Sequence, residues 1–404
     1  MIRILKKNNF VKSVSILSSG VFFAQILMVF TIPLLTRLYT PLDYEKLTIF
    51  VGITLILSGL STGRFEVAIP KKNELSEVVN LIHLSLSLNI LFSILYLTLY
   101  IILSLFFDLE KYWILIPICS FFIGLYNIFY YWALYREKFS DISKTRVSQV
   151  ITSNLISILF GFLGVGIGLL VGHIVNFATG FFRLSKDYLL NFHKYENKIN
   201  LKKTFYDNSN YIKFATPEYI FQNISYYLPL IYLTTLAPLV VGYIFLLTKI
   251  INIPLNLVGR SISNIFYLKT KDKNDYFKYF IKNYIFGFIL SSSLIGFMCV
   301  VIYYFNTFIF GENWSGINDI LWLMLPIGVG QFLTSTYSTI FYNLNKEKIL
   351  MFISMFGFFF RISPFIFFKE SIVNMFLIFN GIFYVLFSIL IFFLVYHWKS
   401  ITNR

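Results

Sequence analysis

Charged side chains inside apolar runs are the residues of this 404-residue chain that are best suited to bind a ligand. Cations outnumber carboxylates there by five to two. The cations are Arg64, Lys213, Lys249, Arg260 and Arg361, and the carboxylates are Glu66 and Glu218. A pocket with this excess of positive charge attracts an anion, and arginine can hold the oxygens of a phosphate in a bidentate way. The pattern predicts a binding site for an anionic, phosphate-like ligand.

Most of these charges also have a purely structural explanation. For Lys249 and Arg361 the structural alternative is an internal ion pair or a carbonyl contact, and we expect both to line a cavity. Residues two apart do not share a helix face, so Arg64 and Glu66 are expected to have different partners; a local pair is the alternative. Lys213 is expected to extend its ammonium to water.

The elements that position these charges are long apolar helices. Only 13% of the residues are charged and 57% are hydrophobic, whereas soluble domains carry about 25% charged residues. A membrane-spanning helix needs ~20 apolar residues, and the chain has room for twelve. The expected helices are 13–36, 47–69, 79–107, 112–135, 147–164, 166–183, 211–236, 238–262, 281–309, 317–343, 348–368 and 371–397, with a tight glycine turn near Gly164.

The distribution of lysine and arginine supports this arrangement. Of the 34 such residues, 25 fall in alternate segments between the expected helices, four in the other segments and five within helices. Basic residues gather on the cytoplasmic side of membrane proteins. We therefore predict a multi-pass protein of the bacterial inner membrane with both termini in the cytoplasm. The net charge of +15 is explained by these loops, so no nucleic acid is expected as a partner.

The chain divides into two halves of nearly equal size at the polar loop 184–210. We expect one six-helix bundle over residues 1–197 and a second over 198–404. Gln25 precedes Pro41 by the same interval that separates Gln222 from Pro238, and repeated halves are common in transporters. Pro33 and Pro229 lie in the first helix of each half. Because proline removes a helical hydrogen bond, these two are the expected hinges.

Several segments resemble one family of bacterial transporters. They read Ser-Gly-Val-Phe-Phe-Ala-Gln at 19–25, Ile-Pro-Leu-Leu-Thr-Arg-Leu-Tyr-Thr-Pro-Leu-Asp-Tyr at 32–44, and Ser-Thr-Gly-Arg-Phe-Glu-Val-Ala-Ile-Pro at 61–70. Further matches are Phe-Gly-Glu-Asn-Trp at 310–314 and Tyr-Asn-Leu-Asn-Lys-Glu-Lys at 342–348. In this order, the segments resemble polysaccharide exporters of the Wzx O-antigen flippase type.

The resemblance implies an all-α fold of the multidrug/oligosaccharidyl-lipid/polysaccharide (MOP) exporter superfamily. In that MATE-like fold, two six-helix bundles related by pseudo-two-fold symmetry face a central cavity. The implied cargo is an undecaprenyl-diphosphate-linked oligosaccharide, with membrane lipid, the polysaccharide polymerase and the chain-length regulator as partners. We expect a monomer without cofactor or bound metal. The cavity residues would be Arg64, Lys249, Arg260 and Arg361.

The predicted activity is that of a flippase rather than an enzyme. No P-loop motif is present in the sequence, so an ion gradient would drive transport, with Glu66 and Glu218 as candidates to bind the coupling cation. Two alternatives stay open. A membrane polysaccharide polymerase would need a long periplasmic loop with catalytic groups, and a drug exporter of the same fold would be recognised by protection against toxic organic cations.

Overall fold

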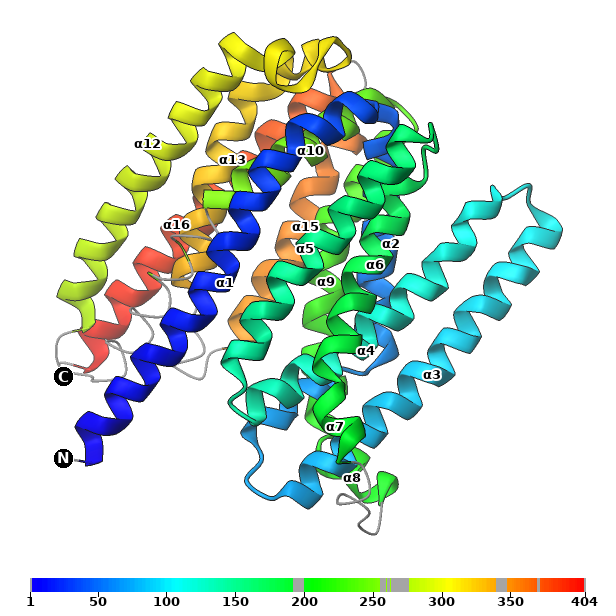
Figure 1. Ribbon diagram of the computed structural model, residues 1–404. Helices are drawn as coiled ribbons and strands as arrows, with labels where there is room; N and C mark the ends of the chain where they lie inside the picture. The colour runs from blue at the N-terminus through cyan, green and yellow to red at the C-terminus, as the bar shows by residue number, and fades with distance from the viewer. Residues whose placement is uncertain are drawn as a thin grey trace. The chain divides into compact units, whose positions relative to one another are not determined.

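The computed structural model of the chain describes residues 2–191, 200–254, 259, 262, 276–338, 347–368 and 371–402. All regular structure in these ranges is helical and comprises fourteen α-helices with short 3-10 and π-helical turns (Figure 1). The chain forms two compact units. The first unit holds residues 1–39 and 49–227, and the second holds 40–48 and 228–404.

The first unit contains most of the helices from the first half of the sequence. They are α1 (Ile2–Leu38), the end of α2 (Pro41–Ser61), α3 (Leu75–Phe106), α4 (Leu115–Tyr135), α5 (Phe139–Phe162), α6 (Gly168–Leu184), α7 (Lys186–Leu190), α8 (Leu201–Asp207) and the start of α9 (Thr216–Thr234). Short turns η1 (Phe65–Lys71), η2 (Lys111–Ile114) and the π-helical η4 (Tyr211–Ala215) join them. The predicted tight turn between α5 and α6 is confirmed, since Gly164 has a left-handed φ of 71°.

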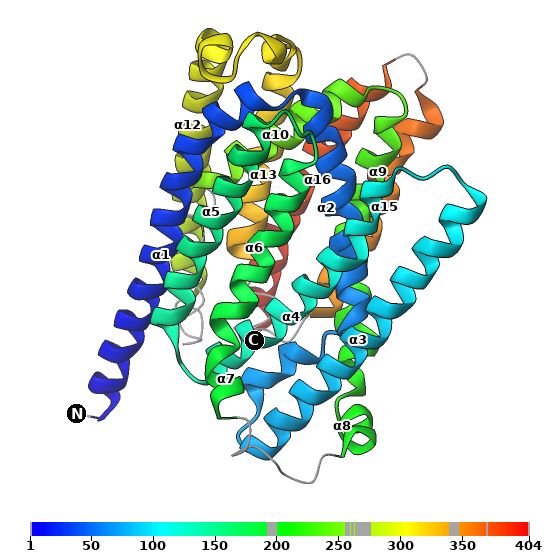
Figure 2. The same cartoon turned by 45° about the vertical axis from the view of Figure 1, so that its right-hand side comes forward.

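Helix α5 packs against α6 on one side and α1 on the other (Figure 2). Small residues bring the backbones of α5 and α6 together, because a Cβ on Gly172 would lie 2.1 Å from Ser157 Oγ. Thr152 and Thr179 hydroxyls then hydrogen-bond across the same interface at 2.9 Å. Close approach of small residues and polar bonds of this kind hold helices together in lipid, where no hydrophobic force draws them to one another.

The second helix begins and ends earlier than the sequence pattern predicted. Thr40 caps α2 through hydrogen bonds with Asp43, its hydroxyl donating to Asp43 Oδ2 at 2.8 Å, and Pro41 occupies the first helical position, where its missing N–H costs nothing. Gly63 and Arg64 both take left-handed conformations, with φ of 57° each. Glycine favours this conformation after a helix, so α2 stops at Ser61 and the predicted continuation to residue 69 is wrong.

The second unit contains the remaining helices. They are the start of α2, the end of α9, α10 (Pro238–Pro254), α12 (Tyr276–Phe310), α13 (Asn318–Tyr337), α15 (Glu347–Phe367) and α16 (Ile372–Thr402), with the 3-10 turn η6 (Glu312–Ile317) before α13. Trp314 of η6 is fully buried, and its ring meets Tyr44 edge-on at 5.0 Å between centroids. This contact explains why residues 40–48 belong to the second unit.

Eight helical segments of the described chain are long and apolar enough to cross a membrane. They are 19–38, 41–61, 75–106, 111–135, 280–310, 312–337, 349–367 and 372–395. Each of the twelve predicted segments overlaps one helix of the structure. Helices α5, α6, α9 and α10 are less apolar or shorter, and α5 turns Thr145 and Gln149 into the protein interior. The protein is a multi-pass membrane protein, and twelve crossings stay a prediction.

Candidate functional site

The turn after α2 holds a buried ion pair. Arg64 Nη1 lies 3.3 Å from Glu66 Oε1, and the Glu66 side chain is 0% exposed. Residues 64 and 66 lie in a left-handed turn and in η1, so the rule that residues two apart point to different helix faces does not apply here. The expectation that the two have different partners is therefore wrong, and the local-pair alternative is confirmed.

Aromatic rings and a second carboxylate complete this cluster in the first unit. The guanidinium of Arg64 lies 4.4 Å from the centre of the Tyr219 ring. Tyr219 can approach α2 because residue 59 is glycine, where a Cβ would lie 2.2 Å from the ring. Tyr131 of α4 also interacts electrostatically with Arg64. Glu218, half-buried on α9, adds a favourable electrostatic interaction with Arg64.

This environment keeps the Arg64 guanidinium charged. Burial by itself lowers the pKa of Arg64, whereas Glu66, Tyr131, Tyr219 and Glu218 raise it, and the net direction is upward. The structure therefore brings together three of the predicted site residues, Arg64, Glu66 and Glu218. Their arrangement gives one cation flanked by two carboxylates, which is less positive than the sequence count suggested.

Arg361 is the second buried cation and lies in the second unit. Its side chain is 4% exposed, and its guanidinium lies 4.3 Å from the ring centre of Phe383 and 4.7 Å from that of Tyr384, both on α16. A cation held against two aromatic faces is attracted by the negative charge of each π-face, and the attraction grows where water is excluded. Both aromatic partners of Arg361 come from α16, so the two rings hold the guanidinium of α15 against the neighbouring helix.

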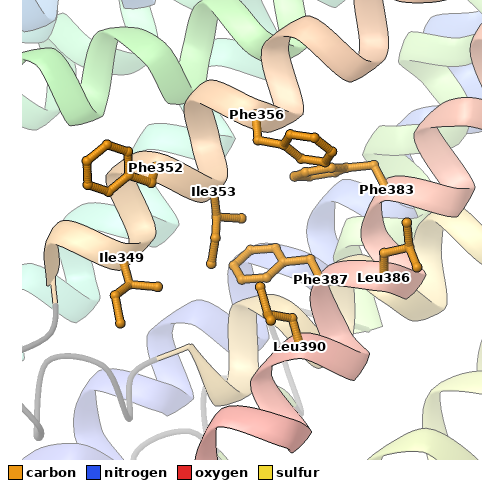
Figure 3. A pocket seen from close by; sticks show the side chains of 8 residues that line it. All are labelled: Ile349, Phe352, Ile353, Phe356, Phe383, Leu386, Phe387 and Leu390. Atoms are coloured by element: carbon orange, nitrogen blue, oxygen red, sulfur yellow. The ribbon is translucent and has the colours of Figure 1, made fainter.

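An apolar groove begins at the ring of Phe383. It has a volume of about 300 Å³ and runs between α15 and α16 (Figure 3). Figure 3 shows Ile353, Phe356, Phe383 and Phe387 pointing into the space between the two helices. Its lining consists of Ile349, Phe352, Ile353, Phe356, Phe383, Leu386, Phe387 and Leu390.

Gly357 links this groove to Arg361. Ile349, Ile353, Gly357 and Arg361 follow one another at intervals of four along α15, so they lie close to one face of the helix. A Cβ on Gly357 would lie 2.5 Å from the Phe383 ring. The missing side chain lets the ring rest on α15 between the groove and the guanidinium. One aromatic side chain therefore touches a cation and an apolar groove.

Lys249 lies on α10 and is half-buried. Its ammonium is 5.9 Å from the ring centre of Phe245, one helical turn earlier. In the described part of the chain no carboxylate lies within ion-pair distance of Lys249. Arg361 and Lys249 belong to the same unit and keep separate aromatic partners. Arg260, the fourth predicted cavity residue, lies outside the described residues.

The two predicted hinge prolines lie within unbroken helices. Pro33 is inside α1 and Pro229 is inside α9. In α9 the chain passes from the first unit to the second between Tyr227 and Leu228, next to Pro229. Lys213 lies in η4 and is exposed, as expected for a residue that reaches water.

Sequence reasoning did not find the aromatic partners of the two buried cations. Tyr219 lies 155 positions after Arg64, and Phe383 lies 22 after Arg361, so no local pattern pairs them. A usable signal did exist for the turn at Gly63, since glycine after an apolar run marks the end of a helix. The aromatic cluster of α4 is mostly core, with Tyr126, Phe129 and Trp132 buried.

Comparison with solved structures identifies the fold. The inward-facing conformation of a multidrug resistance MATE family transporter of the MOP superfamily matches with a TM-score of 0.63 at 12% identity, covering 96% of this chain and 94% of that chain. The outward-facing conformation matches with a TM-score of 0.63 at 12% identity, covering 97% and 96%.

A third match is a MOP superfamily transporter from Pyrococcus furiosus, in which reverse polarity of the binding pocket suggests a different function. It has a TM-score of 0.61 at 11% identity and covers 97% of this chain and 96% of that chain. No protein-family model matches the chain, and no curated protein matches its sequence. The chain therefore has the fold of MOP superfamily transporters.

Proposed function

We propose that this protein is a flippase that moves an undecaprenyl-diphosphate-linked oligosaccharide from the cytoplasmic to the periplasmic leaflet of a bacterial inner membrane. The fold supports a transporter, since the matched structures are MOP superfamily transporters over nearly the whole chain. The identity of the cargo rests on the chemistry of the second unit.

The observation that carries the proposal is the shared ring of Phe383. On one side it supports the Arg361 guanidinium, and on the other it lines an apolar groove. A ligand suited to both has an anionic group joined to a long apolar chain. A diphosphate supplies several acceptor oxygens for an arginine, and an isoprenoid chain supplies the apolar part. Lys249 adds a second positive charge in the same unit.

Transport would proceed by alternating access between inward-open and outward-open states, as in other transporters built from repeated halves. Pro33 and Pro229 are the proposed hinges, because each removes a helix hydrogen bond. The proposed energy source is an ion gradient. A coupling proton or cation that binds Glu66 or Glu218 would compete with Arg64 for the carboxylate, which would link ion binding to the arrangement of α2 and α9.

The proposal is tested by complementation. Cells without the gene receive the wild type, Arg361→Ala, Arg361→Lys, Lys249→Ala or the control Lys111→Ala, whose side chain is exposed. We expect Arg361→Ala and Lys249→Ala to reduce surface polysaccharide about ten-fold or more at matched protein level, because a charge-assisted hydrogen bond contributes about 1.5–3 kcal/mol. Arg361→Lys should retain part of the activity, and Lys111→Ala all of it.

A transport assay gives the decisive outcome. Purified wild-type protein in liposomes should make a lipid-linked oligosaccharide accessible from the opposite leaflet, and the undecaprenyl-diphosphate carrier should be required. Wild-type protein that moves no lipid-linked sugar would refute the proposal, as would full activity of Arg361→Ala and Lys249→Ala.

A drug exporter of the same fold is the second candidate, favoured by the multidrug resistance transporters among the matched structures. Its cargo would be an organic cation, which Arg361 and Lys249 would repel. Growth of the deletion strain in toxic organic cations separates the two functions. Sensitivity that the wild-type gene corrects, without any change in surface polysaccharide, would favour the exporter.

A further inference from the structure

A polar pocket lies in the first unit, and its lining includes none of the charged residues considered so far. It has a volume of about 350 Å³ and is formed where α4 ends, α5 begins and α6 passes into α7. Its lining consists of Trp132, Ala133, Lys138, Asp141, Thr145, Arg183, Leu184, Lys186, Asp187 and Leu190. Three cations and two carboxylates give the pocket a net positive charge.

Two residues of the pocket lining form an ion pair. Lys138 Nζ lies 2.6 Å from Asp187 Oδ1, and both side chains are partly shielded from solvent. Among the described residues, neither Arg183 nor Lys186 makes an ion pair, and both are exposed at the rim. Two positive charges are therefore available to an anion. The second oxygen of Asp187, Oδ2, is buried and accepts no hydrogen bond from the described residues, so it can accept one from a hydroxyl group.

Exposed leucines border the charged residues. Leu189 is 58% exposed and Leu190 is 83% exposed, and both follow directly after Asp187 and Tyr188 on α7. A membrane-spanning segment of the described chain, 111–135, ends three residues before Lys138. Polar groups next to exposed leucines at the end of a membrane helix are typical of the lipid interface. The basic residues of this end of the unit place it on the predicted cytoplasmic side.

We propose that this pocket binds the head group of an anionic, hydroxyl-bearing phospholipid such as phosphatidylglycerol. Arg183 and Lys186 hold the phosphate, Asp187 Oδ2 accepts a hydrogen bond from a head-group hydroxyl, and the acyl chains lie beside Leu189 and Leu190. Basic pockets between membrane helices on the cytoplasmic side bind anionic head groups in this way. The site is independent of the proposed transport function.

The test measures lipid binding to the purified full-length protein by native mass spectrometry. The probes are phosphatidylglycerol, phosphatidylethanolamine and soluble glycerol 1-phosphate. The variant Arg183→Gln/Lys186→Gln removes both rim charges. Its matched control, Lys202→Gln/Lys203→Gln, removes two exposed charges from α8, also on the predicted cytoplasmic side. Because all four side chains are exposed, each variant is expected to fold, and an unchanged melting temperature checks this. The single variants Arg183→Gln and Lys186→Gln serve as a second set.

We expect the wild type and the control to retain phosphatidylglycerol in preference to phosphatidylethanolamine, and the rim variant to lose affinity about ten-fold or more. Equal loss in the rim variant and the control would overturn the proposal, because it would indicate general attraction to positive charge. Equal retention of both lipids would also overturn it, as would unchanged binding by the rim variant. Binding of glycerol 1-phosphate as tight as that of the lipid would assign the pocket to a soluble anion instead.

Discussion

Arg64 and Arg361 show two ways in which a membrane protein accommodates a buried guanidinium. Arg64 has a carboxylate partner and an aromatic ring, and its backbone takes a left-handed conformation that is uncommon for a residue other than glycine. Arg361 lies against two rings. The first arrangement pairs the charge with a carboxylate, whereas the second places it against two π-faces. Around Arg361 an apolar groove also lies next to the charge, because the Phe383 ring contributes to both.

Substitution at Glu66 tests the ion pair at the residue scale. Removing one partner of a buried pair leaves the other charge uncompensated and typically costs about 3–5 kcal/mol. We expect Glu66→Gln to lower the melting temperature markedly, and Arg64→Gln/Glu66→Gln to lose less than the two single variants together. The control is Glu77→Gln, because Glu77 pairs with Lys72 at 3.6 Å on the surface and such pairs contribute about 0–1 kcal/mol. Equal effects of Glu66→Gln and Glu77→Gln would show that the buried pair contributes little.

Glycines set the distance between elements. On α6, a Cβ at Gly172 would lie 2.1 Å from Ser157 Oγ and 2.8 Å from the Ser153 carbonyl oxygen on α5. On α12, a Cβ at Gly296 would meet nothing within 4 Å. Glycine therefore has a different structural role on each of these two helices. At Gly172 it allows close packing, and at Gly296 it leaves room for a side chain.

At the element scale, Gly172→Ala should destabilise the protein by about 1–3 kcal/mol, because α5 and α6 must move apart to accept the added methyl group. Gly296→Ala should be neutral or stabilising by up to about 1 kcal/mol, because alanine favours a helix more than glycine does. Melting temperatures in one detergent measure both changes. If the Gly172→Ala variant has a melting temperature equal to or above that of the Gly296→Ala variant, α5 and α6 do not pack as closely as described.

The orientation of the chain in the membrane is a property of the whole molecule. Both native cysteines, Cys119 and Cys299, are buried, so cysteines introduced at exposed positions can be labelled selectively. Lys111 and Lys202 are exposed, and α4, α5 and α6 lie between them in the chain. An odd number of crossings between the two residues places them on opposite sides of the membrane.

We therefore predict that a membrane-impermeant maleimide added to intact cells labels Lys111→Cys and not Lys202→Cys. Permeabilised cells should show labelling of both, which controls for reactivity. Labelling of both variants in intact cells would mean that α4, α5 and α6 do not make three crossings. Labelling of Lys202→Cys alone would mean that the predicted orientation is reversed.

Hydropathy and charge in the sequence were enough to predict the class of the protein and the approximate place of each long helix in the described part of the chain, but they placed Arg64 in a helix rather than in the turn after it. Hydropathy and charge are summed over neighbouring residues, so a local stretch of sequence is enough to reveal them. The Thr40–Asp43 cap and Gly63 also carried local signals that define the true ends of α2.

The surroundings of each charge depend on how the helices pack in three dimensions. Tyr219 reaches Arg64 because α9 packs on the glycine face of α2, and Phe383 reaches Arg361 because Gly357 leaves space for its ring. The pocket formed by Lys138, Arg183 and Lys186 requires three helix ends to meet. These contacts join residues far apart in the chain, and packing of whole helices, rather than the local sequence around any one residue, determines which of them form.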